Sequence, residues 1–254
     1  MASVEWLLID VGSVLIIDDY GVARFLQRVC DIARAGGRPL TLEQVMRERE
    51  TLVNTKLDPA PYLSVANRHL ADAMRERAYR EVVEAISQHW QAFNTPAKDV
   101  REVLTRLARR YHLAIAANQP ANCRAALDEL GLLRHFEVVG ISAEMGIAKP
   151  DPAFFTRILE QAGCPPSAAI MIGDRIDNDI APAKALGLGT IQVRMDPGEN
   201  GFDPRDEAER AYIESLRRAP ARGRGNHRLV HPDAAVTRLA DLPAAVEHVA
   251  LVHG

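Results

Sequence analysis

The segment at residues 6–19 constrains the fold more than any other part of the sequence. It begins with the apolar run WLLI, which has the length and composition of a strand that is buried on both faces of a parallel sheet. The run ends in one carboxylate, Asp10, after which Gly12 and Ser13 favour a tight turn. Ligands of open α/β sheets bind at the carboxyl ends of the strands, so Asp10 is either a functional acid or the cap of this turn.

Strand-like and helical patterns alternate from residue 95 to residue 193, and a last strand–helix pair follows at residues 228–248. We expect strands at residues 112–117, 136–139, 168–172 and 190–193, with helices at 121–130, 152–163 and 179–186. Such alternation is typical of a parallel, doubly wound sheet with right-handed crossovers. Residues 20–94 show helical periodicity only, with a possible capping box formed by Thr41 and Gln44.

The predicted fold class is therefore α/β, with a doubly wound parallel-sheet, Rossmann-like core and a smaller all-α cap domain inserted after the first strand. Residues 1–19 and 95–254 make up the core, and residues 20–94 make up the helical cap. The segment 195–228 is rich in Arg, Asp, Glu, Gly and Pro, with one helical patch at residues 208–216. Its mixed charges favour a solvated surface excursion of the core, and an oligomer contact or an active-site flap is the alternative.

The bulk properties argue against several classes of function. A net charge of -3 gives no reason to expect nucleic acid as a partner. No apolar run is long enough to cross a bilayer, and the start of the sequence lacks the pattern of a secretory signal. Cys30, Cys123 and Cys164 lack the spacing of metal ligands and fit reduced, mostly buried thiols. We therefore expect a cytoplasmic protein without a membrane partner, assembled as a monomer or a homodimer.

A cluster of acids follows the strand predicted at 168–172. Asp174, Asp177 and Asp179 repel one another unless a hard cation lies between them, and their oxygens suit Mg²⁺, which often bridges to a phosphate. The alternative is that Asp177 and Asp179 cap the next helix. Lys149 is one of only four lysines in the sequence, and its ammonium group would offset two carboxylates or bind a phosphate oxygen.

Taken in order, the segments around Asp10, Asn118, Lys149 and Asp174 resemble those of the haloacid dehalogenase-like (HAD) hydrolase superfamily. The resemblance covers nearly the whole chain, with the helical segment at the place of the cap. Its most specific parts are the sequence KPDP, which starts at Lys149, and the acids of residues 173–179.

The resemblance implies a mechanism. Asp10 is expected to be the nucleophile, which attacks phosphorus and becomes an aspartyl phosphate that water hydrolyses. Mg²⁺ is expected to bind Asp10, the backbone carbonyl of Gly12 and Asp174, while Asp179 supports the water shell of the ion. Lys149 is expected to steady the nucleophile and the phosphoryl oxygens.

Two positions depart from the family pattern. Gly12 stands where phosphatases of the family usually carry a second Asp, whose proton transfer to and from the reacting oxygens contributes roughly 10²–10⁴-fold to the rate. Ala117 replaces a Ser or Thr, which removes one hydrogen bond to a charged oxygen, about 1.5–3 kcal/mol. Ser13, at a position that is commonly Gly, is a candidate replacement hydroxyl. We expect Ser13, Asn118 and Lys149 to bind the substrate.

The expected function is that of an Mg²⁺-dependent phosphatase acting on a small phosphorylated metabolite with a good leaving group, such as a sugar 1-phosphate. One alternative is a catalytically weakened or inactive relative that binds a ligand or a protein partner. A 2-haloacid dehalogenase is less favoured, because those enzymes lack the metal and have a Ser/Asn pattern in place of Asp174 and Asp179. A phosphonate hydrolase would need a cap lysine, and Lys56 is the only lysine in the predicted cap.

Overall fold

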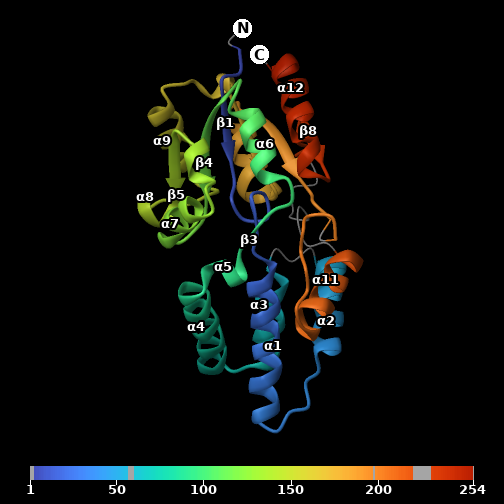
Figure 1. Cartoon of the computed structure of the whole chain (residues 1–254). Coiled ribbons are helices and arrows are strands. Elements are labelled where there is room, and N and C mark those ends of the chain that lie inside the picture. Colours follow the sequence, from blue (N-terminus) through green and yellow to red (C-terminus); the bar gives the residue numbers. More distant parts are fainter. Residues whose placement is uncertain (1–2, 57–59, 197, 220–229, 254) are drawn as a thin grey trace. The chain divides into compact units, whose positions relative to one another are not determined.

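The computed structural model describes residues 3–56, 60–196, 198–219 and 230–253, without the side chains of residues 55 and 56. The side chain of Lys56, and residues 197 and 220–228 of the charged segment, therefore lie outside the described part. The chain divides into two compact units, which are drawn in Figure 1. The first unit comprises residues 3–16, 96–200 and 230–253, and the second comprises residues 17–95 and 201–219.

The first unit contains a six-stranded sheet in the order β5-β4-β1-β6-β7-β8, in which all neighbours are parallel (Figure 1). Its strands are β1 (Trp6–Ile9), β4 (His112–Ala117), β5 (Val138–Ile141), β6 (Ala169–Gly173), β7 (Gly189–Val193) and β8 (Ala234–Val236). The parallel sheet, with β1 between β4 and β6, confirms the predicted doubly wound α/β fold.

Strand β1 is central, and all four of its residues are buried, as its apolar sequence predicts. Ile9 lies level with Ile115 of β4 and with Ile172 of β6. The residues that follow β1 and β6 therefore emerge side by side at the same edge of the sheet. Strand β5 begins two residues later than predicted and follows the 3₁₀ turn η2 (Leu133–His135).

Helices cover both faces of the sheet. They are α6 (Val100–Leu107), α7 (Asn122–Glu129), α8 (Ser142–Met145), α9 (Pro152–Ala162), α10 (Ala181–Ala185) and α12 (Leu242–His253). Between them lie the 3₁₀ turns η3 (Pro166–Ala168) and η5 (Leu239–Asp241) and the π-helical turn η4 (Ile176–Ile180). Phe154 and Ile158 of α9 share a buried cluster with Leu8 and Met171, which lie on one face. Helix α12 packs on β6, β7 and β8, and α6 packs against α12.

The second unit is helical, as predicted for the segment after the first strand. It contains α1 (Asp19–Ala35), α2 (Leu42–Thr51), η1 (Leu52–Lys56), α3 (Pro61–His69), α4 (Asp72–Gln88), α5 (Trp90–Phe93) and α11 (Glu207–Arg218). The predicted capping box at the start of α2 is present, because Thr41 and Gln44 each bond the other's backbone N–H. The short strands β2 (Ile16–Ile17) and β3 (Thr95–Pro96) pair where the chain passes between the units.

The charged segment differs from the expectation of a solvated excursion of the core. Its helix α11 belongs to the second unit and packs against α1 and α2. The exposed face of α11 carries most of its charges, whereas Tyr212 and Leu216 are buried in the unit's hydrophobic cluster. Arg49 of α2 donates hydrogen bonds to the carbonyl oxygen of Ser215, at 3.1 Å, and to its hydroxyl, at 3.0 Å. The charged composition of the segment did not show that this helix is amphipathic, with an apolar face packed on the helical unit.

The three cysteines are free thiols, and Cys30 and Cys123 are buried. Burial raises the pKa of Cys30 to about 11 and that of Cys123 to about 12, so both stay protonated near neutral pH. Among the described helices, none combines the length and the apolar character needed to cross a membrane.

Candidate active site

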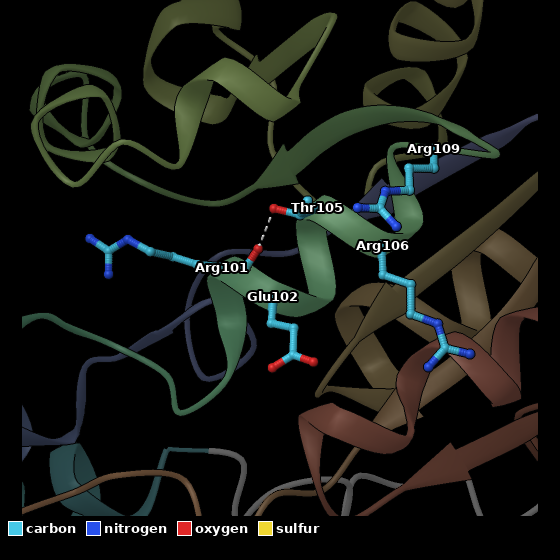
Figure 2. A pocket seen from close by; sticks show the side chains of 5 residues that line it. All are labelled: Arg101, Glu102, Thr105, Arg106 and Arg109. Atoms are coloured by element: carbon cyan, nitrogen blue, oxygen red, sulfur yellow. Dashed lines mark hydrogen bonds between the residues drawn. The ribbon is translucent and has the colours of Figure 1, made fainter.

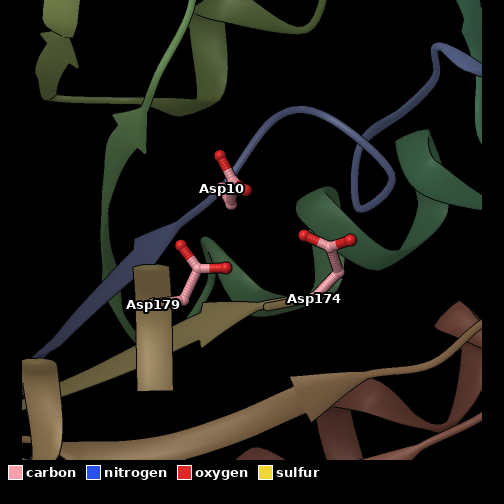
Figure 3. A group of neighbouring side chains, drawn as sticks. All are labelled: Asp10, Asp174 and Asp179. Carbon is pink, nitrogen blue, oxygen red and sulfur yellow. The ribbon is translucent and has the colours of Figure 1, made fainter. Parts of the chain in front are cut away.

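Three carboxylates meet at the carboxyl edge of the sheet (Figure 3). Asp10 follows β1, Asp174 follows β6, and Asp179 lies in the turn η4. One carboxylate oxygen of each lies within 4.8 Å of the others. The parallel register brings Asp10 and Asp174 to adjacent strand ends, and the Asp10 N–H donates to the Ile172 carbonyl at 2.9 Å. We call Asp10, Asp174 and Asp179 the acid cluster.

Lys149 lies against this acid cluster. Its Nζ is 2.9 Å from Oδ1 of Asp10 and 2.6 Å from Oδ1 of Asp179, and its side chain is 1% exposed. Although burial lowers the pKa of Lys149, the two carboxylates outweigh it and raise the pKa above its ordinary value, so the amine stays charged. One ammonium group faces three carboxylates, which leaves an excess of negative charge when all are ionised.

Asp10, the candidate nucleophile, has a raised pKa. Burial raises the pKa of Asp10 to about 6, Lys149 opposes this rise, and the charge of Asp179 adds to it. The Val11 N–H donates to Oδ1 of Asp10 at 2.8 Å, so this oxygen is held from two sides. Asp10 is therefore an oriented carboxylate, largely ionised near neutral pH and more basic than an exposed one.

Asp179 is held by the backbone as well as by Lys149. The N–H of Arg175 donates to Oδ2 of Asp179 at 2.9 Å, and the side chain is completely buried. A Cβ atom on Gly173 would lie 2.4 Å from Cγ of Asp179, so only glycine fits beside this carboxylate. Asp179 therefore bonds the N–H of Arg175, the N-cap residue of η4, in addition to facing Lys149.

Asp177 is separate from the acid cluster. Its carboxylate accepts from Nε of Arg175 at 2.9 Å and from a second guanidinium nitrogen of the same residue. Burial raises the pKa of Asp177, but the bonds and charge of Arg175 outweigh this and lower it below its ordinary value. Asp177 therefore forms a local ion pair at the edge of the site.

Asn118 uses both atoms of its amide group on the backbone of Lys149. Its Nδ2 donates to the Lys149 carbonyl and its Oδ1 accepts from the Lys149 N–H, both at 2.8 Å. This pair of bonds fixes the segment that carries the ammonium group. Ala117, at the end of β4, is fully buried and offers no side-chain hydrogen bond.

The loop after Asp10 is compact. The carbonyl of Val11 accepts from the N–H groups of Val14, Leu15 and Ile16, at 3.3, 2.9 and 3.0 Å. Ser13 has a φ of 59°, in the left-handed region that favours glycine. Only 8% of the residue is exposed. A serine held there is under strain of about 1–3 kcal/mol, which is more common at functional sites than elsewhere.

The acid cluster fits a divalent metal ion. Its donors are carboxylate oxygens from three residues, they lie close together, and one ammonium group offsets only part of their charge. Oxygen donors and excess negative charge are what Mg²⁺ requires in proteins. Gly12, whose carbonyl is the predicted further ligand, lies in the same loop as Asp10 and forms a bridge with Ile16.

The sequence analysis did not identify Gln192 as a residue that contacts the site. It lies in β7, is 1% exposed, and its Nε2 donates to the carbonyl oxygen of Asp174 at 2.9 Å. A glutamine is an unusual residue in a buried strand, and that is the one signal that could have singled it out.

A hollow of about 380 Å³ lies elsewhere in the first unit, on the exposed side of α6 (Figure 2). It is lined by Arg101, Glu102, Thr105, Arg106 and Arg109, and none of the predicted site residues contributes to it. Arg101 donates to the Leu130 carbonyl at 2.7 Å. The hollow reflects the solvated face of an amphipathic helix and is not the candidate active site.

The comparisons with known proteins agree with the fold. The family profile of haloacid dehalogenase-like hydrolases matches residues 5–187, so the chain belongs to this hydrolase family. A phosphoserine phosphatase of Thermus thermophilus is 32% identical over 157 residues, which are 54% of this chain and 59% of that protein. The match therefore spans less than two thirds of that relative's length.

Two solved structures illustrate the likeness of fold. A 2-haloacid dehalogenase of Pseudomonas syringae gives a TM-score of 0.54 at 20% identity, covering 96% of this chain and 99% of the other. The magnesium-bound HAD-hydrolase YfnB of Bacillus subtilis gives 0.61 at 18% identity, also covering 96% and 99%. At such identities the likeness concerns the fold alone.

Proposed function

We propose that this chain is an Mg²⁺-dependent phosphatase that hydrolyses a small phosphorylated metabolite. The observation that carries the proposal is the contact of Lys149 with Asp10 inside a cluster of three carboxylates. Relatives named as phosphatases, such as the phosphoserine phosphatase, support the same reaction class. We also propose that the protein is cytoplasmic and that it is a monomer or a homodimer. Its only proposed binding partner is the small phosphorylated substrate.

In this proposal the carboxylate of Asp10 attacks phosphorus and the alcohol oxygen of the substrate leaves. Water then hydrolyses the aspartyl phosphate, which releases inorganic phosphate and restores Asp10. Asp10, the Gly12 carbonyl and Asp174 would hold Mg²⁺, with Asp179 behind its water shell. When bound, the ion supplies positive charge to the phosphoryl oxygens. Lys149 orients Asp10 and adds a second positive charge on the phosphoryl group.

The absence of a side chain at Gly12 limits the substrate. No carboxylate at this position can protonate the leaving oxygen, a loss of roughly 10²–10⁴-fold in rate for a poor leaving group. We therefore propose a phosphate ester whose oxygen leaves readily, as the anomeric oxygen of a sugar 1-phosphate does. Ser13, buried and strained in the same loop, is the proposed hydroxyl that contacts the phosphoryl group.

The second candidate is a weakened or inactive relative that binds a phosphorylated ligand or a protein partner. The substitutions at Gly12 and Ala117 favour it, because each removes a group that enzymes of the family use. The retained acid cluster argues against a dehalogenase, which needs no metal ion.

The test is release of inorganic phosphate from a panel of phosphate monoesters in the presence of Mg²⁺. We expect activity to be highest on esters with good leaving groups and to be lost in Asp10→Asn. Asp241→Asn is the matched control, because Asp241 forms an exposed ion pair with Arg238. Activity that persists in Asp10→Asn would refute the mechanism. No turnover, combined with tight binding of one phosphorylated compound, would favour the second candidate.

A further inference from the structure

Gln192 connects the acid cluster to the neighbouring strand. In the register of the sheet Gln192 of β7 lies opposite Gly173, the residue before Asp174. Its side chain is buried, and Nε2 donates to the Asp174 carbonyl oxygen at 2.9 Å. A buried amide is retained in a strand only when both its polar atoms have partners, because an unpaired one costs about 1–3 kcal/mol.

Arg194 determines which way this amide points. Its Nε donates to Oε1 of Gln192 at 2.7 Å. A guanidinium group can only donate and a carbonyl oxygen can only accept. With Arg194 on one side and the Asp174 carbonyl on the other, a single orientation of the Gln192 amide satisfies both bonds.

The peptide group between Asp174 and Arg175 is therefore held at both of its polar atoms. Its oxygen accepts from Gln192, and its N–H donates to Oδ2 of Asp179 at 2.9 Å. The other oxygen of Asp179 lies 2.6 Å from Nζ of Lys149. An unbroken series of hydrogen bonds thus runs from Arg194 through Gln192 and this peptide group to Asp179 and Lys149.

We propose that Gln192, oriented by Arg194, is a positioning residue that sets the geometry of Asp174 relative to Asp179 and thereby the affinity of the acid cluster for a divalent metal ion. Residues behind metal ligands commonly contribute a factor of about 10–100 in metal affinity. The inference rests on the metal site of the proposed function but not on the identity of the substrate.

The experiment is calorimetric titration of the whole chain with Mg²⁺, which needs no substrate. Gln192→Met keeps the length of the side chain and removes both hydrogen bonds, and we expect Mg²⁺ to bind about 10–100-fold more weakly. Arg194→Met removes only the group that orients the amide, so a smaller weakening is expected. Arg194 is exposed, and this second variant tests the proposal even if Gln192→Met fails to fold.

Thr190→Val is the matched control on the same strand. The Thr190 hydroxyl donates to Asp233 at 2.7 Å, away from the acid cluster, so this variant is expected to lose thermal stability and keep its Mg²⁺ affinity. Asp174→Asn reports on the metal site itself. Wild-type affinity in both Gln192→Met and Arg194→Met, with loss of binding in Asp174→Asn, would overturn the role of Gln192 alone. Wild-type affinity in Asp174→Asn would instead overturn the metal site of the proposed function.

Discussion

Replacing Lys149 by methionine tests the electrostatics of the site. The Lys149 side chain is 1% exposed, and its Nζ contacts the carboxylates of Asp10 and Asp179. Removing one partner of a buried ion pair costs about 3–5 kcal/mol, because the remaining charge is left without compensation. For a chain of this size each kcal/mol corresponds to about 2–4 °C, so Lys149→Met should melt roughly 6–20 °C below the wild type in the presence of EDTA.

Mg²⁺ should recover much of this loss, because the ion replaces the missing positive charge and stabilises the folded state by mass action. The assay is urea or thermal denaturation with EDTA and with Mg²⁺, together with phosphate release, which should be abolished in both conditions. Lys184→Met is the control, since Lys184 pairs with Asp233 at a half-exposed position and such pairs contribute about 0–1 kcal/mol. If Lys149→Met is as stable as the wild type in EDTA, the Lys149 ammonium group does not compensate the charges of Asp10 and Asp179, and that charge balance is refuted.

Three further variants test other parts of the structure. Gly173→Ala places a Cβ 2.4 Å from Cγ of Asp179, so we expect the free energy of unfolding to fall by about 1–3 kcal/mol. The same variant should bind Mg²⁺ more weakly in calorimetry. Gly36→Ala, whose Cβ would have its nearest neighbours at 3.5 Å, is the control and should leave both quantities unchanged. Burial raises the pKa of Asp233, but the bonds from Lys184 and Thr190 outweigh this and lower it below its ordinary value of 3.8. The advantage of the wild type over Asp233→Asn should therefore be complete above pH 3.8 and disappear as the pH falls further, measured by urea denaturation. Arg49→Ala removes the bonds that hold α11 and should speed proteolysis within residues 201–219, whereas Arg47→Ala, at an exposed position of the same helix, should not. Equal cleavage rates for Arg49→Ala and the wild type would contradict the anchoring role.

Much of the fold could be predicted because apolar runs and helical periodicity report directly on burial. The strand His112–Ala117 has the predicted bounds, since five of its six residues are buried and it ends at the polar Asn118. The helix predicted to start at Asp179 begins earlier, at Ile176 as η4, because Asp179 is buried as a partner of Lys149 and not exposed at a helix start. The helix α11 was predicted, but its packing partner was not, because composition indicates how charged a segment is and not which surface its apolar residues cover.

The candidate site was predictable where residue type and strand end coincide. Asp10 and Asp174 follow adjacent strands, so the topology alone brings them together. The roles of Gln192 and of the Asn118 amide were not predictable, because each depends on a contact between segments far apart in the sequence. Gly173 belongs to the same group, since its need for a bare Cα arises from the position of the Asp179 side chain.

The most direct measurement is a crystal structure of the chain with Mg²⁺ and a phosphate mimic such as beryllofluoride. We expect one ion bound to Asp10, to the Gly12 carbonyl and to Asp174, with the mimic on the Asp10 carboxylate and within reach of Lys149. An ion bound away from Asp10 and Asp174, or a mimic seated at a different residue, would contradict the proposed phosphatase mechanism.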